Sequence, residues 1–376
     1  MKIGILTVPF NNNYGGFLQA FALKKVFTDL GHDVVFINRQ PGRHKNVKFY
    51  VKKILSLFHL YKTEYEKKKE IEKISINTNQ FKTQYLEPIT EEYKTSDELK
   101  KCLQLGIDCF VVGSDQVWKC HRSRKDFIDD FYFNFLNGAD IPRFSYAASM
   151  GIDTMEYPIQ KQKICSGLLD SFLAISVREA TTAMIFEKQW GKKNVQVVLD
   201  PTMLHSKDVY YDLFSKKYNA PQYKYLCSYI LDETKELRCE IENCASRLSL
   251  QILDVKAQTG KLNKLAVLIP VEEWLANIYY ADYVITDSFH GMVFSIIFNK
   301  PFIVYLNENR GAARVMDLLD RFGLSERIVT NAKELENKIL NEIDWNTVNR
   351  KRSTCVLDSL NFVYGAMQKV ENQKKL

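Results

Sequence analysis

Residues 283–298 read YVITDSFHGMVFSIIF, and this stretch determines the class of fold that the sequence predicts. Its first four residues are mostly apolar or β-branched, which is typical of a buried strand, and the segment from Gly291 is typical of a buried helix. His290 is therefore expected between a strand end and a helix start, where open α/β sheets bind ligands. A helix start also offers N–H groups and partial positive charge to an anion. The alternative is a histidine packed in the core, because a lone histidine is a weak motif.

The same alternation of strand and helix runs along the rest of the chain. Strands are predicted at residues 2–8, 33–38, 108–115, 143–150, 172–177, 195–199, 223–231, 250–255 and 302–306. Helices are predicted at 17–30 and 179–190, within 43–84, and over 331–375. This β-α-β order predicts parallel sheets with right-handed crossovers. Because 376 residues are too many for one ordinary core, we expect an α/β fold of two domains facing each other across a cleft. The expected boundaries are 1–204 for the first domain and 205–330 for the second, with helices in 331–376 returning toward the first.

Composition favours a cytoplasmic protein. Apolar residues make up 46% and charged residues 26%, and no apolar run reaches the roughly 18 residues of a membrane span. The chain enters a strand directly, so we expect no signal peptide. The eight cysteines form no CxxC pair, and most lie in apolar contexts, so they are expected to be reduced core residues. No structural metal site is predicted.

One segment has the pattern of a membrane-surface helix. Between residues 47 and 61 the apolar side chains recur at helical spacing, and lysines flank them. Such a helix can lie on an anionic membrane, so the sequence predicts a possible peripheral membrane contact. The alternative is an ordinary surface helix whose apolar face covers the first sheet.

Polar clusters follow several predicted strands. The first, NNNYGG at 11–16, follows the first strand, and its paired glycines allow a close backbone approach to a ligand. The second, GSDQVW at 113–118, combines hydroxyl-binding groups with an indole that can pack on a sugar. A plain turn for the first cluster, and a tryptophan that merely caps the sheet for the second, are the alternatives. The predicted acceptor contacts are Asn13, Tyr14, Gly15, Gly16, Ser114, Asp115, Gln116 and Trp118.

Three arginines are candidate anion ligands. Arg178 ends an apolar strand, where its planar fork suits a carboxylate or phosphate. The alternative is an internal ion pair with Glu179 or Asp200; the turn at Asp200 itself is expected to be structural. Arg310 and Arg314 stand at a helix start, the wrong end for the helix dipole, which suggests that they bind an anion. No paired catalytic carboxylates, thiol nucleophile or metal cluster competes, so the sequence predicts acid–base chemistry by His290 on an anionic small molecule and a sugar-like partner.

Five blocks together resemble the polysaccharide pyruvyl transferase family. They are NNNYGGFLQAFAL (11–23), FVVGSDQVWK (110–119), SVREATTA (176–183), VLDPT (198–202) and ITDSFHGMVFSIIFNKPFIVY (285–305). The resemblance implies a GT-B-like fold of two Rossmann-like domains. It also implies transfer of the pyruvate unit of phosphoenolpyruvate to a sugar of a bacterial surface glycan, such as an exopolysaccharide or capsule, or its precursor, as a ketal.

The resemblance also implies site roles. His290 takes the place of the catalytic histidine and Arg178 that of the first anion-binding arginine. Some members carry an Arg-Leu dipeptide before the histidine; here the residues are Ser288 and Phe289, so Arg314 or Arg310 is expected to substitute. Ser288 and Gly291 complete the expected donor site at the helix start. No cofactor is implied beyond phosphoenolpyruvate as co-substrate, because arginines can neutralise its two anionic ends. A histidine, with an ordinary pKa of about 6.5, can serve as acid or base.

Two other functions remain open at this stage. A GT-B glycosyltransferase would use a nucleotide-sugar donor and need an acidic residue for its ribose, for which Glu272 or Glu273 is a weak candidate. A non-catalytic carbohydrate-binding protein on the same fold would need neither His290 nor Arg178. The acceptor sugar, its hydroxyls, any lipid linkage and the oligomeric state are not predicted, and nothing in the sequence indicates nucleic-acid binding.

Overall fold

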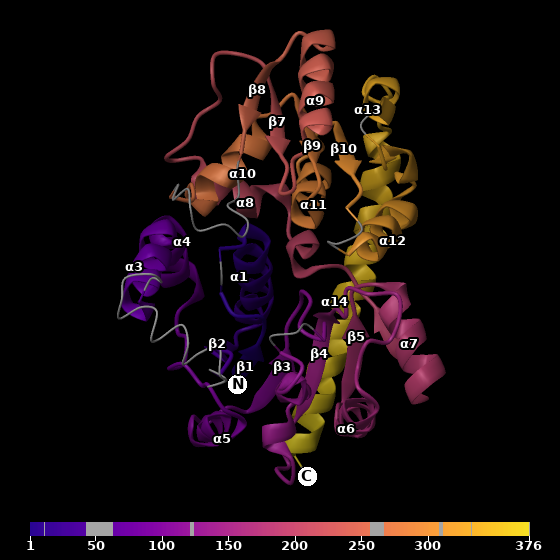
Figure 1. The fold of residues 1–376 in the computed structure, drawn as a ribbon. Coiled ribbons are helices and arrows are strands. Elements are labelled where there is room, and N and C mark those ends of the chain that lie inside the picture. Colours follow the sequence, from indigo (N-terminus) through magenta and orange to yellow (C-terminus); the bar gives the residue numbers. More distant parts are fainter. Residues whose placement is uncertain are drawn as a thin grey trace.

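The protein is described from a computed structural model, which defines residues 1–10, 12–42, 63–120, 124–255, 267–307, 311–331 and 333–375. It contains two parallel sheets, each flanked by helices, and one sheet lies above the other in the view of Figure 1. The predicted amphipathic segment 47–61 and Arg310 lie outside the described residues. Within the described parts of the chain, no helix has the length and apolarity needed to cross a bilayer.

The first sheet has six strands in the order β2-β1-β3-β4-β5-β6. Its register is parallel throughout, with Lys2 opposite Asp33 and Ile3 opposite Cys109. These strands are β1 (Lys2–Leu6), β2 (Asp33–Ile37), β3 (Cys109–Val112), β4 (Arg143–Ala148), β5 (Ala174–Val177) and β6 (Val195–Val197). The helices of this part are α1 (Tyr14–Asp29), α3 (Glu64–Ile74), α4 (Ile76–Phe81), α5 (Ser96–Leu99), α6 (Ile159–Leu169) and α7 (Ala180–Trp190).

The second sheet has five strands in the order β11-β10-β9-β7-β8. Its strands are β7 (Tyr225–Tyr229), β8 (Gln251–Asp254), β9 (Tyr283–Thr286), β10 (Phe302–Tyr305) and β11 (Ile328–Val329). Its helices are α8 (Lys207–Phe214), α9 (Lys235–Arg247), α10 (Val271–Tyr279), α11 (Phe289–Ile297), α12 (Ala312–Phe322) and α13 (Lys333–Lys338). Short 3-10 segments cover Lys100–Gln104, Ile128–Tyr132, Asn134–Leu136, Pro201–Leu204 and Ser325–Arg327, and a π-helical turn covers Lys82–Leu86.

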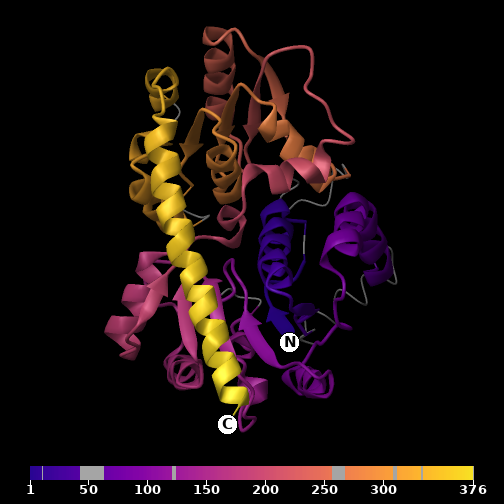
Figure 2. The same cartoon turned by 180° about the vertical axis from the view of Figure 1, so that it is seen from behind.

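The last helix, α14 (Trp345–Lys374), runs along the back of both sheets (Figure 2). Near its start it packs on α12, and further along it meets β4. Ser359 Oγ accepts a hydrogen bond from Leu199 N, and Lys369 Nζ donates to Leu173 O. These contacts tie the end of the chain to the first sheet.

Apolar side chains also join the two halves directly. The ring of Tyr14, at the start of α1, stacks on Trp274 of α10 with centroids 5.4 Å apart. The Tyr14 hydroxyl donates to Ile269 O at 3.2 Å, and burial raises its pKa. One hydrophobic cluster therefore runs from the first domain into the second without a polar break.

All of the predicted strands in the described residues are present, and several boundaries differ. Helix α1 begins at Tyr14 instead of residue 17, because Asn13 Oδ1 accepts from Gly15 N and starts the helix earlier. Helix α11 likewise begins at Phe289, with Ser288 as its cap. The two-residue strand β11 was not predicted; it is too short to show periodicity.

Candidate active site

The turn between β9 and α11 is fixed by its own polar groups. The Asp287 carboxylate accepts hydrogen bonds from Leu231 N at 2.7 Å and Asp232 N at 3.0 Å. Ser288 Oγ accepts from Gly291 N at 3.5 Å and caps the helix. His290 therefore stands in the first turn of a rigidly held helix, with 5% of its surface exposed.

The His290 ring lies between the two domains. A Cβ atom on Gly15 of α1 would lie 1.9 Å from Nδ1, so the helix backbone contacts the imidazole directly. On the other side, Nε2 is 3.7 Å from Asp200 Oδ2, an ion-pair distance that is too long for a hydrogen bond. Nε2 has no hydrogen-bond partner among the described residues. The ring is thus positioned by packing against Gly15, and its Nε2 is available for a proton transfer.

Arg178 follows β5 immediately and is surrounded by carboxylates. Its Nη1 donates to Asp200 Oδ2 at 2.9 Å, its Nη2 lies 3.5 Å from Asp115 Oδ1, and its Nε lies 3.8 Å from Glu179 Oε2. Only 3% of the side chain is exposed. Burial by itself would lower the pKa of Arg178, but Asp200, Asp115 and Glu179 outweigh it and raise the pKa. The internal ion pair with Glu179 and Asp200 is therefore real in this structure.

A second arginine joins the cluster from the other domain. Arg314, in the first turn of α12, places its Nη1 3.5 Å from Asp115 Oδ1. The Phe289 ring contacts both guanidinium groups, with its centroid 4.5 Å from Arg178 Cζ and 5.0 Å from Arg314 Cζ. Burial and the charge of Arg178 lower the pKa of Arg314 to about 10, so it stays protonated at neutral pH. Phe289 thus makes a cation–π contact with each arginine, and Asp115 Oδ1 lies 3.5 Å from a nitrogen of both.

Three carboxylates complete the cluster, contrary to the expectation that none would compete. Asp200 Oδ1 accepts from Thr202, and its Oδ2 accepts from Ser114 Oγ. Burial would raise the pKa of Asp200, but His290 and Arg178 outweigh it and hold that pKa well below its usual range. The pKa of Asp115 is also lowered: Arg178, Arg314 and His290 overcome the effect of burial.

Glu179 holds the loop after β4. Its Oε1 accepts from Ser149 Oγ at 2.6 Å, Gly151 N at 3.1 Å and Thr182 Oγ1 at 2.8 Å. Counted by formal charge, the three carboxylates and two arginines give the cluster a net charge of −1. The charges of Arg178 and Arg314 are therefore already neutralised by carboxylates of the protein itself.

Several predicted contact residues lie elsewhere than expected. Trp118 is fully buried, donates from its indole to Phe131 O at 2.9 Å and stacks on Tyr132, so the prediction that it faces a sugar is wrong. Tyr14 is equally covered, because it packs on Trp274 across the domain junction. Both rings were taken for ligand surfaces because a buried aromatic and a binding aromatic look alike in sequence.

The remaining predicted residues divide between framework and site. Asn13 is an exposed helix cap, and a Cβ on Gly16 would make only ordinary van der Waals contact with the Asn13 side chain. Gly291 is required by packing, since a Cβ there would lie 2.4 Å from Thr286 Oγ1. Gln116 lies between Gly151 and Gly311 of the two domains, and its Nε2 is buried without a hydrogen-bond partner in the described structure.

From the sequence, Asp200 and Glu179 were named only as the alternative ion-pair partners of Arg178, and the contacts of Phe289 were missed. Asp200 was interpreted as a structural turn, which it also is, because its side chain accepts from Thr202 N. The available signal was its place directly after a predicted strand, the same signal that identified Arg178. Nothing in the local sequence indicates that Phe289 contacts two arginines from different elements. Among the described residues, no group of three or more His, Cys, Asp or Glu side chains is arranged to hold a metal ion.

The fold resembles that of several solved structures. The UDP-GlcNAc 2-epimerase of Methanocaldococcus jannaschii superposes with a TM-score of 0.52 at 11% identity, over 92% of this chain and 93% of that one. Arabidopsis thaliana UGT89C1, complexed with quercetin, gives 0.52 at 9% identity over 98% and 99%. S. aureus MnaA in a UDP co-structure gives 0.53 at 10% identity over 93% and 90%. At these identities the likeness concerns the fold alone: two parallel-sheet α/β domains of the GT-B class.

The family follows from the sequence match. The model of the polysaccharide pyruvyl transferases matches residues 13–309, a span that includes strands β2 to β10 and, of the cluster, His290, Arg178, Asp115, Glu179, Asp200 and Phe289. The chain belongs to the polysaccharide pyruvyl transferase family, and it is therefore a transferase of polysaccharide biosynthesis. It matches no curated protein sequence.

Proposed function

We propose that this protein transfers the pyruvate unit of phosphoenolpyruvate to two hydroxyls of a sugar, forming a cyclic ketal and releasing inorganic phosphate. The observation that carries the proposal is His290, whose Nε2 faces a buried arginine–carboxylate cluster built from both domains. Family membership supplies the reaction class. The geometry supports an acid–base role for His290, beside arginines that can bind an anion.

The chemistry can be written with this residue alone as proton carrier. Protonation of the donor's methylene carbon produces a cation at the adjacent carbon, one sugar hydroxyl adds there, and its proton leaves to a base. The carbon–oxygen bond to phosphate then breaks, and the second hydroxyl closes the ketal. One of the two hydroxyl protons balances that taken up by the methylene carbon, and the other leaves on hydrogen phosphate. An imidazole can act as both acid and base, so His290 can give the first proton and take one back.

Donor binding must rearrange the cluster. Phosphoenolpyruvate carries up to three negative charges, whereas the resting cluster already has a net charge of −1. Two arginines can accept the donor only if it displaces Asp115 or Asp200 from them. The contact between Arg314 and Asp115 joins the second domain to the first, so we infer that a small separation of the domains releases Arg314 from Asp115. Arg178 must exchange a carboxylate of its own domain for the donor.

Donor identity is tested by thermal unfolding of the pure protein with each candidate. We expect phosphoenolpyruvate to raise the melting temperature, because a ligand that binds only the folded state stabilises it. UDP and GDP serve as the matched comparison for the nucleotide-sugar alternative. Stabilisation by a nucleotide and not by phosphoenolpyruvate would reverse the proposal in favour of a glycosyltransferase.

Two neighbouring glycines of α1 test whether the position of the His290 ring matters. Gly15→Ala places a Cβ 1.9 Å from Nδ1, so the ring must move, whereas the Cβ of Gly16→Ala meets nothing nearer than Asn13 Nδ2 at 3.7 Å. Both variants share the same helix and the same gain in helix propensity. We expect turnover to fall about a hundredfold in Gly15→Ala, the cost of a misplaced catalytic group. Gly16→Ala should stay near wild type, and equal turnover in the two variants would show that the ring position is irrelevant.

A further inference from the structure

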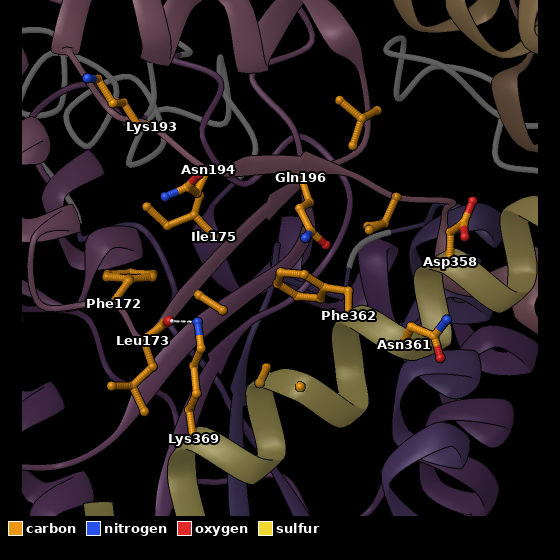
Figure 3. A pocket seen from close by; sticks show the side chains of 15 residues that line it. Phe172, Leu173, Ile175, Lys193, Asn194, Gln196, Asp358, Asn361, Phe362 and Lys369 are labelled. Atoms are coloured by element: carbon orange, nitrogen blue, oxygen red, sulfur yellow. Dashed lines mark hydrogen bonds between the residues drawn. The ribbon is translucent and has the colours of Figure 1, made fainter.

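A cavity of about 830 Å³ opens on the first domain, between the strands β5 and β6 and the helix α14 (Figure 3). Its volume lies within the range of small-molecule sites, roughly 300–1,000 Å³. None of the residues of the His290 cluster lines it. The cavity, here named the β6 groove, is lined from the strand side by Lys193, Asn194 and Gln196 and from the helix side by Asn361, Phe362 and Lys369.

The groove exists because the helix does not fill the space beside the sheet. Parallel sheets normally have both faces covered by helices. Here α14 meets β4, while β6 ends the sheet that the described residues form. The helix presents Gly365 and Ala366 to the gap, and no described residue comes within 4 Å of the place a Cβ on Gly365 would take.

Packing therefore does not explain Gly365. A glycine inside a helix costs roughly 0.5–1 kcal/mol relative to alanine. The close approach of another chain segment would account for that cost, but in the described structure the site faces open space. What the missing side chain does provide is room in the β6 groove.

The lining has the chemistry of a carbohydrate site. Three amides, Asn194, Gln196 and Asn361, offer both donors and acceptors to hydroxyls, and all three side chains are exposed. The rings of Phe172 and Phe362 supply apolar surface for sugar C–H groups. Such a mixture of apolar walls and a few polar groups is typical of ligand sites.

The charge of the groove favours an acidic ligand. The lining contains two lysines, Lys193 and Lys369, and one carboxylate, Asp358, which gives it a net formal charge of +1. Lys369 Nζ donates to Leu173 O at 3.0 Å and spans from helix to strand (Figure 3). Lys193 lies at another part of the rim and is exposed, so its ammonium group can meet a carboxylate on the ligand.

We propose that the β6 groove binds a segment of acidic oligosaccharide, a second glycan site apart from the His290 cluster. The inference rests on the proposed function, because a glycan-modifying enzyme meets its polymer at more than one sugar. Val198 lines the groove, and Asp200 of the His290 cluster follows it two residues later. Two residues of extended chain span about 7 Å. A polymer held here would stay close to the cluster while one of its sugars is modified.

Calorimetric titration with defined oligosaccharides tests the proposal. The acidic probes are the hexasaccharides of hyaluronan and polygalacturonate, and the neutral probes are chitohexaose and maltohexaose. We expect at least one acidic probe to bind the wild type more tightly than both neutral probes. Gly365→Leu fills the groove and should weaken that binding about tenfold or more, since the lining then no longer admits the sugar.

Gly365→Ala is the matched control, because its methyl group meets no described residue within 4 Å and should leave binding near wild type. Melting temperatures of both variants verify that the fold is intact. Absence of binding by every acidic probe, equal binding of neutral probes, or unchanged binding in Gly365→Leu would overturn the proposal. Binding by His290→Ala protein separates the two claims, since a groove ligand should bind it normally even if the proposed transfer reaction proves wrong.

Discussion

Replacing His290 with alanine should lower turnover by about a hundredfold or more, the usual contribution of a general acid–base group. The ring faces the cluster through a nitrogen without a hydrogen-bond partner in the described structure, so little else is placed to move the proton. The fold should survive, because the ring is held by contact with Gly15 and by a long 3.7 Å approach to Asp200. Turnover and melting temperature of the variant, measured side by side, check this.

A second histidine provides the control. His32 is half-buried beside the start of β2, at the opposite edge of the first sheet from Asp200. His32→Ala should keep wild-type turnover. Near-normal turnover in His290→Ala would remove this residue from the mechanism.

Replacing Arg178 with alanine should lower the free energy of unfolding by about 3–5 kcal/mol, a loss typical of breaking a buried ion pair. No other substitution proposed for this protein is expected to destabilise it as much. Removal of Arg178 leaves Asp200, Asp115 and Glu179 buried without the guanidinium group that neutralises them. Denaturant unfolding measures the change as a shift in midpoint at constant slope.

Arg238 is a matched control, because it also meets three carboxylates, those of Glu233, Glu242 and Asp254. Its side chain is 30% exposed, so Arg238→Ala should cost about 1 kcal/mol or less. Equal losses of unfolding free energy in Arg178→Ala and Arg238→Ala would show that burial does not increase the contribution of Arg178 to stability.

Arg178→Lys separates structure from binding. Lysine keeps the charge but loses the planar fork, so the fold should be stable enough to assay while affinity for phosphoenolpyruvate falls. Undiminished affinity in this variant would mean that Arg178 serves only the internal ion pairs.

The fold could be predicted because its elements are strongly patterned. Strands such as β9 are largely apolar runs, and polar residues follow several of them, so both the parallel sheets and the sheet edge carrying the site could be predicted. Two features of the fold could not be predicted from the apolar pattern. Helix starts depend on single side-chain caps, here Asn13 and Ser288, and a two-residue strand such as β11 has no period.

The site could be predicted only in part, because its geometry depends on how the domains face each other. His290 and Arg178 were identified from their positions at strand ends. The pairing of Arg314 with Asp115 and the contact of Phe289 with two arginines need residues from separate domains, which no local pattern relates. Trp118 was misassigned because composition does not reveal which side of a loop an aromatic ring occupies.

The most direct test of the pyruvyl transfer proposed here is mass spectrometry of the surface glycan from cells that lack the protein, compared with cells supplied with the wild type or with His290→Ala. The proposed function predicts a glycan that carries a pyruvate ketal only when the wild-type protein is present, with its sugar sequence otherwise unchanged. A glycan that keeps its pyruvate without the protein, or that loses a whole sugar residue instead, would contradict it.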